Sequence, residues 1–162
     1  MVRVLGIDPG AHGGFCFRDT SHEQYVDAYA FNKLTPHDIA GIIQNEKEIC
    51  KICGMQIKAY IEEVHSMPRD GKASAFSFGK NFGMWLGILT ALGIPYEEVL
   101  PAKWQVGLKL RVRGMDYRDK KKALKEIAQK KFPELNLTLD TCDAVLIAEY
   151  GCRTIIENNF KR

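Results

Sequence analysis

The 162-residue sequence lacks a hydrophobic run long enough to cross a membrane. Its longest stretch without a charged residue, from 81 to 96, is shorter than the roughly 20 residues that a spanning helix requires. No targeting segment is visible either. We therefore expect a cytoplasmic protein that has no membrane partner.

Cysteine is sparse, with five copies, and no signal peptide is visible. An odd number of cysteines without a signal peptide favours free thiols in a reducing compartment. Cys50 and Cys53 have the spacing of zinc ligands, but no second pair follows at a matching interval. We interpret them as a thiol pair inside a helix. Internal repeats, low-complexity segments and domain linkers are also missing, so we expect one domain over residues 1–162.

Apolar runs bounded by turn residues and helix-start signals predict ten elements. Strands are expected at 2–8, 13–18, 24–31, 56–64 and 96–100. Helices are expected at 36–53, 72–92, 103–108, 117–132 and 138–158. This order predicts an α/β fold with a mixed five-stranded sheet, three antiparallel strands followed by parallel strands, and helices on both faces.

Acidic residues stand at the ends of predicted elements. Asp8 and Glu62 end the first and fourth strands, and Asp140 and Asp143 open the last helix. The first and fourth strands are expected to pair in parallel, which would place Asp8 and Glu62 about 5 Å apart. Asp140 and Asp143 are three residues apart and would share one helix face. Clustered carboxylates require a neutralising cation, and Mg²⁺ prefers oxygen ligands, so this pattern predicts a metal site suited to phosphodiester hydrolysis.

Each acid also has a purely structural interpretation. Asp8 would be a turn residue, Asp140 an N-cap, and Asp143 an acid stabilised by the helix dipole. The neighbouring Glu63 should point away from Glu62 because side chains alternate along a strand, so we expect it to be exposed or structural. The joint placement of the four acids favours the metal site.

Positive charge is concentrated in one segment. Residues 101–135 carry 11 basic and 4 acidic side chains, a net charge of +7, whereas residues 1–100 have a net charge of −3. Such a segment suits a phosphate backbone as partner. The alternative is a solvated helix face without a ligand.

Small residues recur every fourth position in the predicted helix 72–92, where they are surrounded by apolar side chains. Because each glycine costs about 1 kcal/mol of helix propensity, a close backbone approach should compensate. We prefer a second subunit as the partner, and the alternative is coverage by the same chain. The row comprises Ala75, Gly79, Gly83, Gly87 and Ala91.

The segments that carry the acids resemble the RuvC family of Holliday-junction resolvases, within the ribonuclease-H-like nuclease superfamily. GIDPG at 6–10 and IEEV at 61–64 are similar to its first two motifs, and DTCDAVLIAEYG at 140–151 to its closing helix. The segment 76–105, with an aromatic, glycine-rich helix before a Pro-x-x-Trp sequence, resembles the branch found in phages, bacteria and plastids. GIDPG alone would be weak, because actin-like ATPases also open with a similar loop. Some family members have histidine where Asp140 stands.

The resemblance implies a homodimeric endodeoxyribonuclease, joined through helix 72–92, that cuts four-way DNA junctions symmetrically in a bacterium or phage-infected cell. The four acids Asp8, Glu62, Asp140 and Asp143 would hold two Mg²⁺ ions, which Mn²⁺ should replace, and no small-molecule cofactor is expected. The cut would leave a 5′-phosphate and a 3′-hydroxyl.

Lys120 or Lys121 would lie near the scissile phosphate in such an enzyme. A basic arm and two aromatic side chains would contact the junction, although core packing is an equal alternative for the aromatics. The expected DNA contacts are Phe76, Phe78, Lys80, Lys109, Arg111, Arg113, Lys120 and Lys121.

Two other functions remain open at this point. The chain would be a different nuclease of the superfamily, acting on an RNA–DNA hybrid or on structured RNA, or a junction-binding protein that has no catalytic activity.

Overall fold

The computed structural model describes residues 1–21, 26–63, 71–110, 112 and 114–160. The strands of this part of the chain are β1 (Val2–Ile7), β2 (Gly14–Asp19), β3 (Val26–Ala30), β4 (Gln56–Glu62) and β5 (Tyr96–Val99). The helices are α1 (Pro36–Ile52), α2 (Lys72–Ala91), α3 (Pro101–Gly107), α4 (Tyr117–Lys131) and α5 (Cys142–Phe160). The arginines of the expected basic arm, Arg111 and Arg113, lie outside the described residues.

The five strands form one mixed sheet in the order β3-β2-β1-β4-β5. Strands β1, β2 and β3 are antiparallel, whereas β1 pairs with β4 and β4 with β5 in parallel. In the β1–β4 register Ile7 faces Ile61, so the next residues, Asp8 and Glu62, emerge together at the same edge of the sheet. The predicted sheet and the predicted parallel pairing are confirmed.

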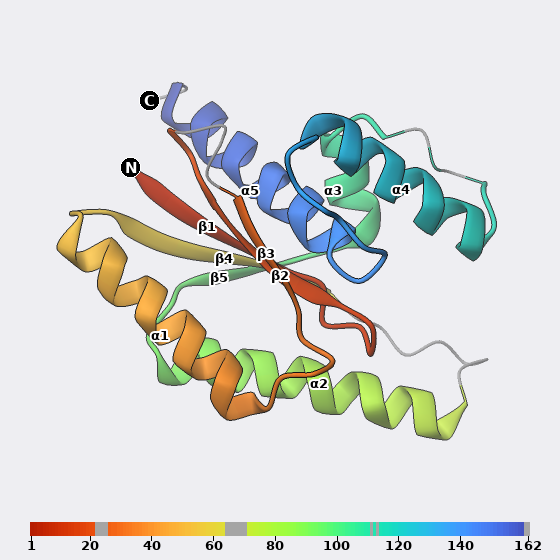
Figure 1. The fold of residues 1–162 in the computed structure, drawn as a ribbon, viewed down its shortest axis with the longest axis horizontal. Coiled ribbons are helices and arrows are strands. Elements are labelled where there is room, and N and C mark those ends of the chain that lie inside the picture. The colour runs from red at the N-terminus through yellow and green to blue at the C-terminus, as the bar shows by residue number, and fades with distance from the viewer. Residues whose placement is uncertain (22–25, 64–70, 111, 113, 161–162) are drawn as a thin grey trace.

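Helices cover both faces of the sheet, as predicted. Figure 1 shows α1 and α2 on one face and α3, α4 and α5 on the other. The two faces have separate apolar cores, one that includes Trp85 and Leu89 of α2 and one built largely from the first half of α5. The sheet is therefore a buried central layer, and its carboxyl-terminal edge is framed by helix ends.

Helix α5 approaches β1 very closely. A Cβ atom at Gly6 would lie only 2.4 Å from the carbonyl oxygen of Ala144 and 2.4 Å from the amide nitrogen of Ala148. A glycine is required there because no side chain fits between the two backbones. This approach brings the start of α5, and with it Asp143, against the end of β1.

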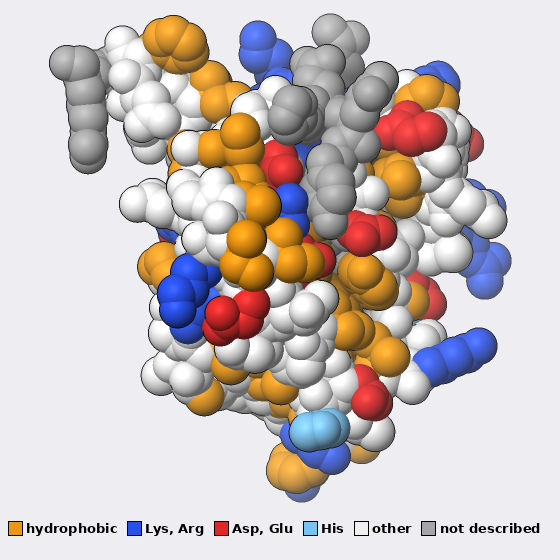
Figure 2. Space-filling model, turned by 60° about the vertical axis from the view of Figure 1, so that its left-hand side comes forward, with side chains coloured by type: hydrophobic (Ala, Val, Ile, Leu, Met, Phe, Trp, Pro, Cys, Tyr) orange, Lys and Arg blue, Asp and Glu red, His pale blue; other side chains and the backbone are white. Residues whose placement is uncertain are grey.

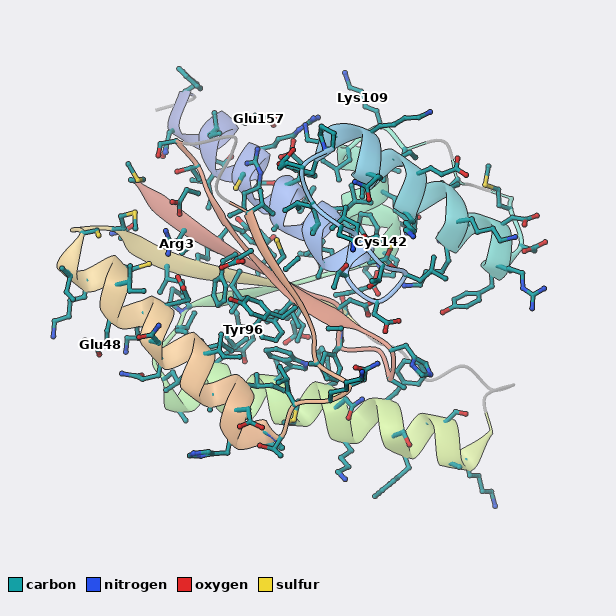
Figure 3. All side chains as sticks on the ribbon, viewed as in Figure 1. Arg3, Glu48, Tyr96, Lys109, Cys142 and Glu157 are labelled. Atoms are coloured by element: carbon teal, nitrogen blue, oxygen red, sulfur yellow. The ribbon has the colours of Figure 1, made fainter. Side chains whose placement is uncertain are left out.

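Helix α1 begins as predicted, with a capping box between Thr35 and Asp38. Its last residue, Ile52, is 83% exposed, so this apolar side chain does not lie on the helix face that covers the sheet. The buried charge Glu46 lies on that face instead and pairs with Arg3 of β1. Figure 3 shows that Arg3 lies near the amino end of β1, opposite the edge where Asp8 emerges.

The start of α5 also differs from the prediction. The helix begins at Cys142, not at residue 138, because a turn over residues 139–141 precedes it. Within this turn, the hydroxyl of Thr141 accepts a hydrogen bond from the backbone N–H of Thr138 at 3.1 Å. Asp140 therefore lies before the helix, and the expectation that Asp140 and Asp143 share one helix face is wrong.

The small-residue row of α2 faces outward, away from the sheet. Gly79, Gly83 and Gly87 are exposed, and no atom of the described residues lies within 4 Å of a Cβ built at any of them. The alternative in which the same chain covers this row is not observed in the described part of the protein. The opposite side of α2 packs on the sheet through Trp85, which is 0% exposed.

Elsewhere the surface is mixed in character. Figure 2, in which the left-hand side of Figure 1 comes forward, shows acidic and basic side chains interspersed with hydrophobic ones. Within the described residues, no helix combines the length and the apolar character that a membrane span requires.

Candidate active site

A cavity of about 310 Å³ opens at the carboxyl-terminal ends of β1 and β4. Its wall is formed by these two strand ends, the loop after β1, and the helices α2, α3, α4 and α5. Three predicted acids and both predicted lysines face this cavity. Its polar lining residues are Asp8, His12, Glu62, Gln105, Tyr117, Lys120, Lys121 and Asp143.

Asp8 is held by the turn that follows β1. Its Oδ1 accepts a hydrogen bond from the backbone N–H of Gly10 at 3.0 Å, and its own N–H donates to the carbonyl of Gly14 at 2.9 Å. A Cβ at Gly13 would lie 2.0 Å from the carbonyl oxygen of Asp8, so the loop can only close with glycine there. The turn after β1, with glycine at positions 10 and 13, thus holds the buried Asp8 carboxylate in place.

Glu62 is held by a side chain from the neighbouring helix. The indole N–H of Trp104, in α3, donates to Oε1 of Glu62 at 2.9 Å. The β4–β5 register explains this contact, because Glu62 faces Val99 and α3 begins two residues later at Pro101. A residue 42 positions away in the sequence is thereby brought back over the end of β4.

Asp143 lies in the first turn of α5 and is buried. The thiol of Cys142 donates to its Oδ1 at 3.4 Å, and the ammonium group of Lys121 contacts its Oδ2. Burial, followed by the charge of Asp143, raises the pKa of the Cys142 thiol to about 12, so this thiol remains protonated and able to donate. Figure 3 shows Cys142 at the start of α5, on the sheet face that this helix covers.

The pKa values of Asp8 and Glu62 are both raised, mainly by burial. Burial and then the charge of Asp8 raise the pKa of Glu62 to about 8, although the hydrogen bond from Trp104 lowers it. Burial raises the pKa of Asp8, partly offset by the charge of Lys121. Burial alone would lower the pKa of Lys121, but Asp143 and Asp8 raise it above its usual value, so the ammonium stays charged. Ionised carboxylates are therefore costly at this site, and the ammonium of Lys121 lies against two of the acids.

Asp140 does not join this cluster. Its Oδ2 accepts a hydrogen bond from the side-chain amide of Asn32 at 3.2 Å. It lines an adjoining hollow that shares His12, Tyr117 and Lys121 with the first cavity. The structure thus brings three of the four predicted acids together and leaves Asp140 beside them. As expected, Glu62 lines the cavity and Glu63 does not.

The expected DNA contacts are spread more widely. Phe78 lines the cavity, while Phe76 is 74% exposed, which excludes core packing for Phe76. Lys80 is exposed on α2. Figure 3 shows Lys109 at the rim of the molecule beyond α3, away from Cys142 at the start of α5.

The residues not predicted from the sequence include His12 and Tyr117, which line the cavity, and Trp104, which donates a hydrogen bond to Glu62 beside it. Trp104 was recognised only as part of a motif, although a tryptophan that follows a strand by one helical turn is well placed to reach back to the strand end. His12 lies two residues beyond GIDPG, and Tyr117 was recognised only as the start of the basic helix. The available signal for His12 was a polar side chain beside the predicted turn, and for Tyr117 its place three residues before Lys120.

The donor atoms of the cavity fit a hard divalent cation, because Asp8, Glu62 and Asp143 offer only carboxylate oxygens. The raised pKa values of Asp8 and Glu62 indicate that their ionised forms lack full compensation, which a bound cation would supply. Within the described residues, however, no three acidic, histidine or cysteine side chains converge as a complete metal site. The ammonium of Lys121 provides positive charge between two of the acids.

The fold is that of RuvC and other ribonuclease-H-like proteins. The chain is similar to a structure of Thermus thermophilus RuvC, with a TM-score of 0.58, 15% sequence identity and 96% coverage of both chains. It is also similar to T. thermophilus RuvC in complex with a Holliday junction substrate, with a TM-score of 0.56, 13% identity and 96% coverage of both chains. No protein-family model matches the sequence, and no curated protein matches it. At this level of identity the similarity establishes the fold.

Proposed function

We propose that this chain is a metal-dependent endodeoxyribonuclease that cuts four-way DNA junctions by paired, symmetric nicks. One observation carries the proposal: Asp8, Glu62 and Asp143, from β1, β4 and α5, face one cavity together with Lys121 on a RuvC-like fold. Burying several carboxylates together lowers the stability of a fold, so such a cluster indicates a functional role. A T. thermophilus RuvC of the same fold is known in complex with a junction substrate, which supports the choice of DNA.

Asp8, Glu62 and Asp143 would hold the cations, and we retain Asp140 as a proposed ligand because it lies in the adjoining hollow. When bound, Mg²⁺ would supply a nucleophilic water at neutral pH and stabilise the charge of the departing 3′ oxygen. The protein fixes the carboxylates in advance through the Gly10 amide, the Trp104 indole and the Cys142 thiol. Pre-positioned ligands reduce the reorganisation needed during the reaction.

Lys121 would have a second role once substrate is present. Its ammonium is charged and lies in the acidic cavity against Asp8 and Asp143. Charge that develops on a phosphate bound in the cavity would be stabilised by this cation. Lys120, on the same face of the cavity, is placed to contact a neighbouring phosphate.

The exposed row of α2 supports the homodimer that the proposal requires. Two strands of a junction are nicked symmetrically most simply by two equivalent sites related by a two-fold axis. The row offers a glycine-rich, apolar helix surface against which an identical helix can pack closely. Because the amino-terminal half of α2 also carries Phe78 at the cavity, this interface would set the distance between the two active sites.

Cleavage assays on three DNA or hybrid substrates test the proposal. A mobile four-way junction, an RNA–DNA hybrid and a linear DNA duplex are incubated with the protein and Mg²⁺, with EDTA as the control. Paired nicks in the junction alone are expected. Preferential cutting of the hybrid would identify a ribonuclease-H-type enzyme, and junction binding without cutting would identify a non-catalytic binding protein.

A further inference from the structure

We infer that Trp104 is a positioning residue of the active site: its indole N–H holds the Glu62 carboxylate ready to bind a divalent cation. This inference rests on the proposed function, because it assigns Glu62 to metal binding. It adds a residue from α3, a helix that contributes no acid to the cluster.

The contact is built into the fold and not made by a mobile surface side chain. Trp104 is 0% exposed and packs in the core between the sheet and α5. Helix α3 is itself fixed on α5, because Gly107 allows so close an approach that a Cβ there would lie 2.6 Å from the ring of Tyr150. The indole N–H therefore reaches Oε1 of Glu62 from a rigid position, at 2.9 Å.

The indole N–H of Trp104 stabilises the ionised form of the Glu62 carboxyl group. An indole N–H can only donate, so it favours an acceptor that carries negative charge. It opposes the effect of burial and of Asp8 on Glu62 and lowers the pKa of that carboxyl group. Among the described residues, Trp104 is the hydrogen-bond donor to Glu62, so its loss would leave the carboxylate without a fixed orientation.

The other tryptophan shows that the fold does not demand this hydrogen bond. Trp85 is equally buried, at 0% exposed, and packs edge-on against Phe15 and Phe31. Its indole nitrogen has no hydrogen-bond partner among the described residues. The protein thus accommodates one buried indole N–H without an acceptor and directs the other at the candidate active site.

This pair of residues provides a matched experiment. Trp104→Phe and Trp85→Phe each replace a fully buried indole by a phenyl ring, and only the first removes a donor from Glu62. Mn²⁺ binding to the DNA-free protein is measured from the electron paramagnetic resonance signal of free Mn²⁺. Loss of a partner that orients a metal ligand typically weakens metal binding by about 10- to 100-fold. We expect a decrease in this range for Trp104→Phe and an unchanged affinity for Trp85→Phe.

A second measurement leaves Trp104 in place and so does not depend on the folding of its variant. The chain has two tryptophans, so in the Trp85→Phe protein the tryptophan fluorescence, excited selectively over that of tyrosine, comes from Trp104 alone. Titration with Mn²⁺ should change this fluorescence over the concentration range in which binding occurs. Adding Glu62→Gln should abolish the response.

The outcomes separate this inference from the proposed function. The role of Trp104 would be overturned if the two phenylalanine variants bound Mn²⁺ with equal affinity. It would also be overturned if Mn²⁺ bound without changing the fluorescence of Trp104. Either result would leave the nuclease proposal intact. A wild-type protein that neither binds Mn²⁺ nor cuts any substrate would overturn both.

Discussion

The ammonium nitrogen of Lys121 lies 3.3 Å from Oδ2 of Asp8 and also contacts Oδ2 of Asp143, so that one side chain of α4 joins the ends of β1 and α5. A buried carboxylate pair is unstable without such a charge. In the absence of metal, Lys121 provides internal neutralisation of the cluster. A divalent cation would take over this role and release the ammonium toward the substrate phosphate.

Replacing Lys121 by glutamine should therefore have two effects that replacement of Lys120 does not have. The metal-free protein should melt several degrees lower, because about 1 kcal/mol shifts the melting temperature of a chain of this size by about 2–4 °C. Mg²⁺ should restore most of this loss, whereas the cleavage rate should stay at least about 100-fold below wild type. Lys120→Gln has the same change of charge and serves as the control. Equal melting temperatures of the two variants in EDTA would refute the neutralising role.

The three clustered acids should be essential for cutting and dispensable for binding. Asp8→Asn, Glu62→Gln and Asp143→Asn keep the shape of each side chain but remove the charge that a cation requires. Junction cleavage should be lost, while junction affinity, measured by gel shift without metal, should stay equal or increase because phosphates are repelled less.

Two further variants set the limits of this site. Glu63→Gln should cut normally, since Glu63 does not line the cavity. We expect Asp140→Asn to reduce cutting as well, and its position outside the three-acid cluster makes this variant the sharpest test of the fourth proposed ligand. Near-normal cutting by Asp8→Asn would refute the whole assignment.

The raised pKa of Glu62, about 8 in the fold against 4.5 as its reference value, predicts a pH-dependent stability. The folded protein binds this proton more tightly than the unfolded chain does. The corresponding stability is complete below about pH 4.5 and is lost as the pH rises through about 8. In EDTA, the melting temperature should therefore fall more steeply from pH 6 to pH 8.5 for the wild type than for Glu62→Gln. Parallel curves for the two proteins would show that the pKa of Glu62 is not raised.

Much of the fold was predictable because residue patterns within single segments and the usual pairing of strands indicate the same arrangement. The apolar run of β1, its Pro-Gly stop and the helix-start residues Thr35 and Pro36 have short-range causes, and they place Asp8 and Glu62 at one sheet edge. The start of α5 was not predictable in this way, because a hydrogen bond between Thr138 and Thr141 competes with the first helical turn.

The side chains that complete the site depend on packing between distant segments. The indole of Trp104 reaches Glu62 only because β5 pairs with β4 in one particular register. Lys121, not Lys120, contacts Asp8 and Asp143 because of how α4 is rotated on α5, where Lys131 of α4 pairs with Glu149 at 2.9 Å. Neither the register nor the rotation can be read from residue types alone.

The exposed row of α2 leads to the last prediction, that the protein is a dimer in solution through this helix. The wild type should sediment at about twice the chain mass of 18.3 kDa. Gly83→Leu and Gly87→Leu should hold two close-packed helices apart and shift the protein toward monomer. Because no described atom lies within 4 Å of a Cβ at either position, the monomer should accommodate the leucines without unfolding.

Gly41→Leu is the matched control for these substitutions. Gly41 lies within another helix, α1, and is equally exposed, with no described atom within 4 Å of its Cβ. This variant should keep the wild-type mass and still nick both strands of the junction, whereas the α2 variants should lose the pairing of the nicks before they lose their fold. If the wild type sediments as a monomer at micromolar concentration, or if all three leucine variants behave alike, the subunit interface does not lie on the glycine row of α2.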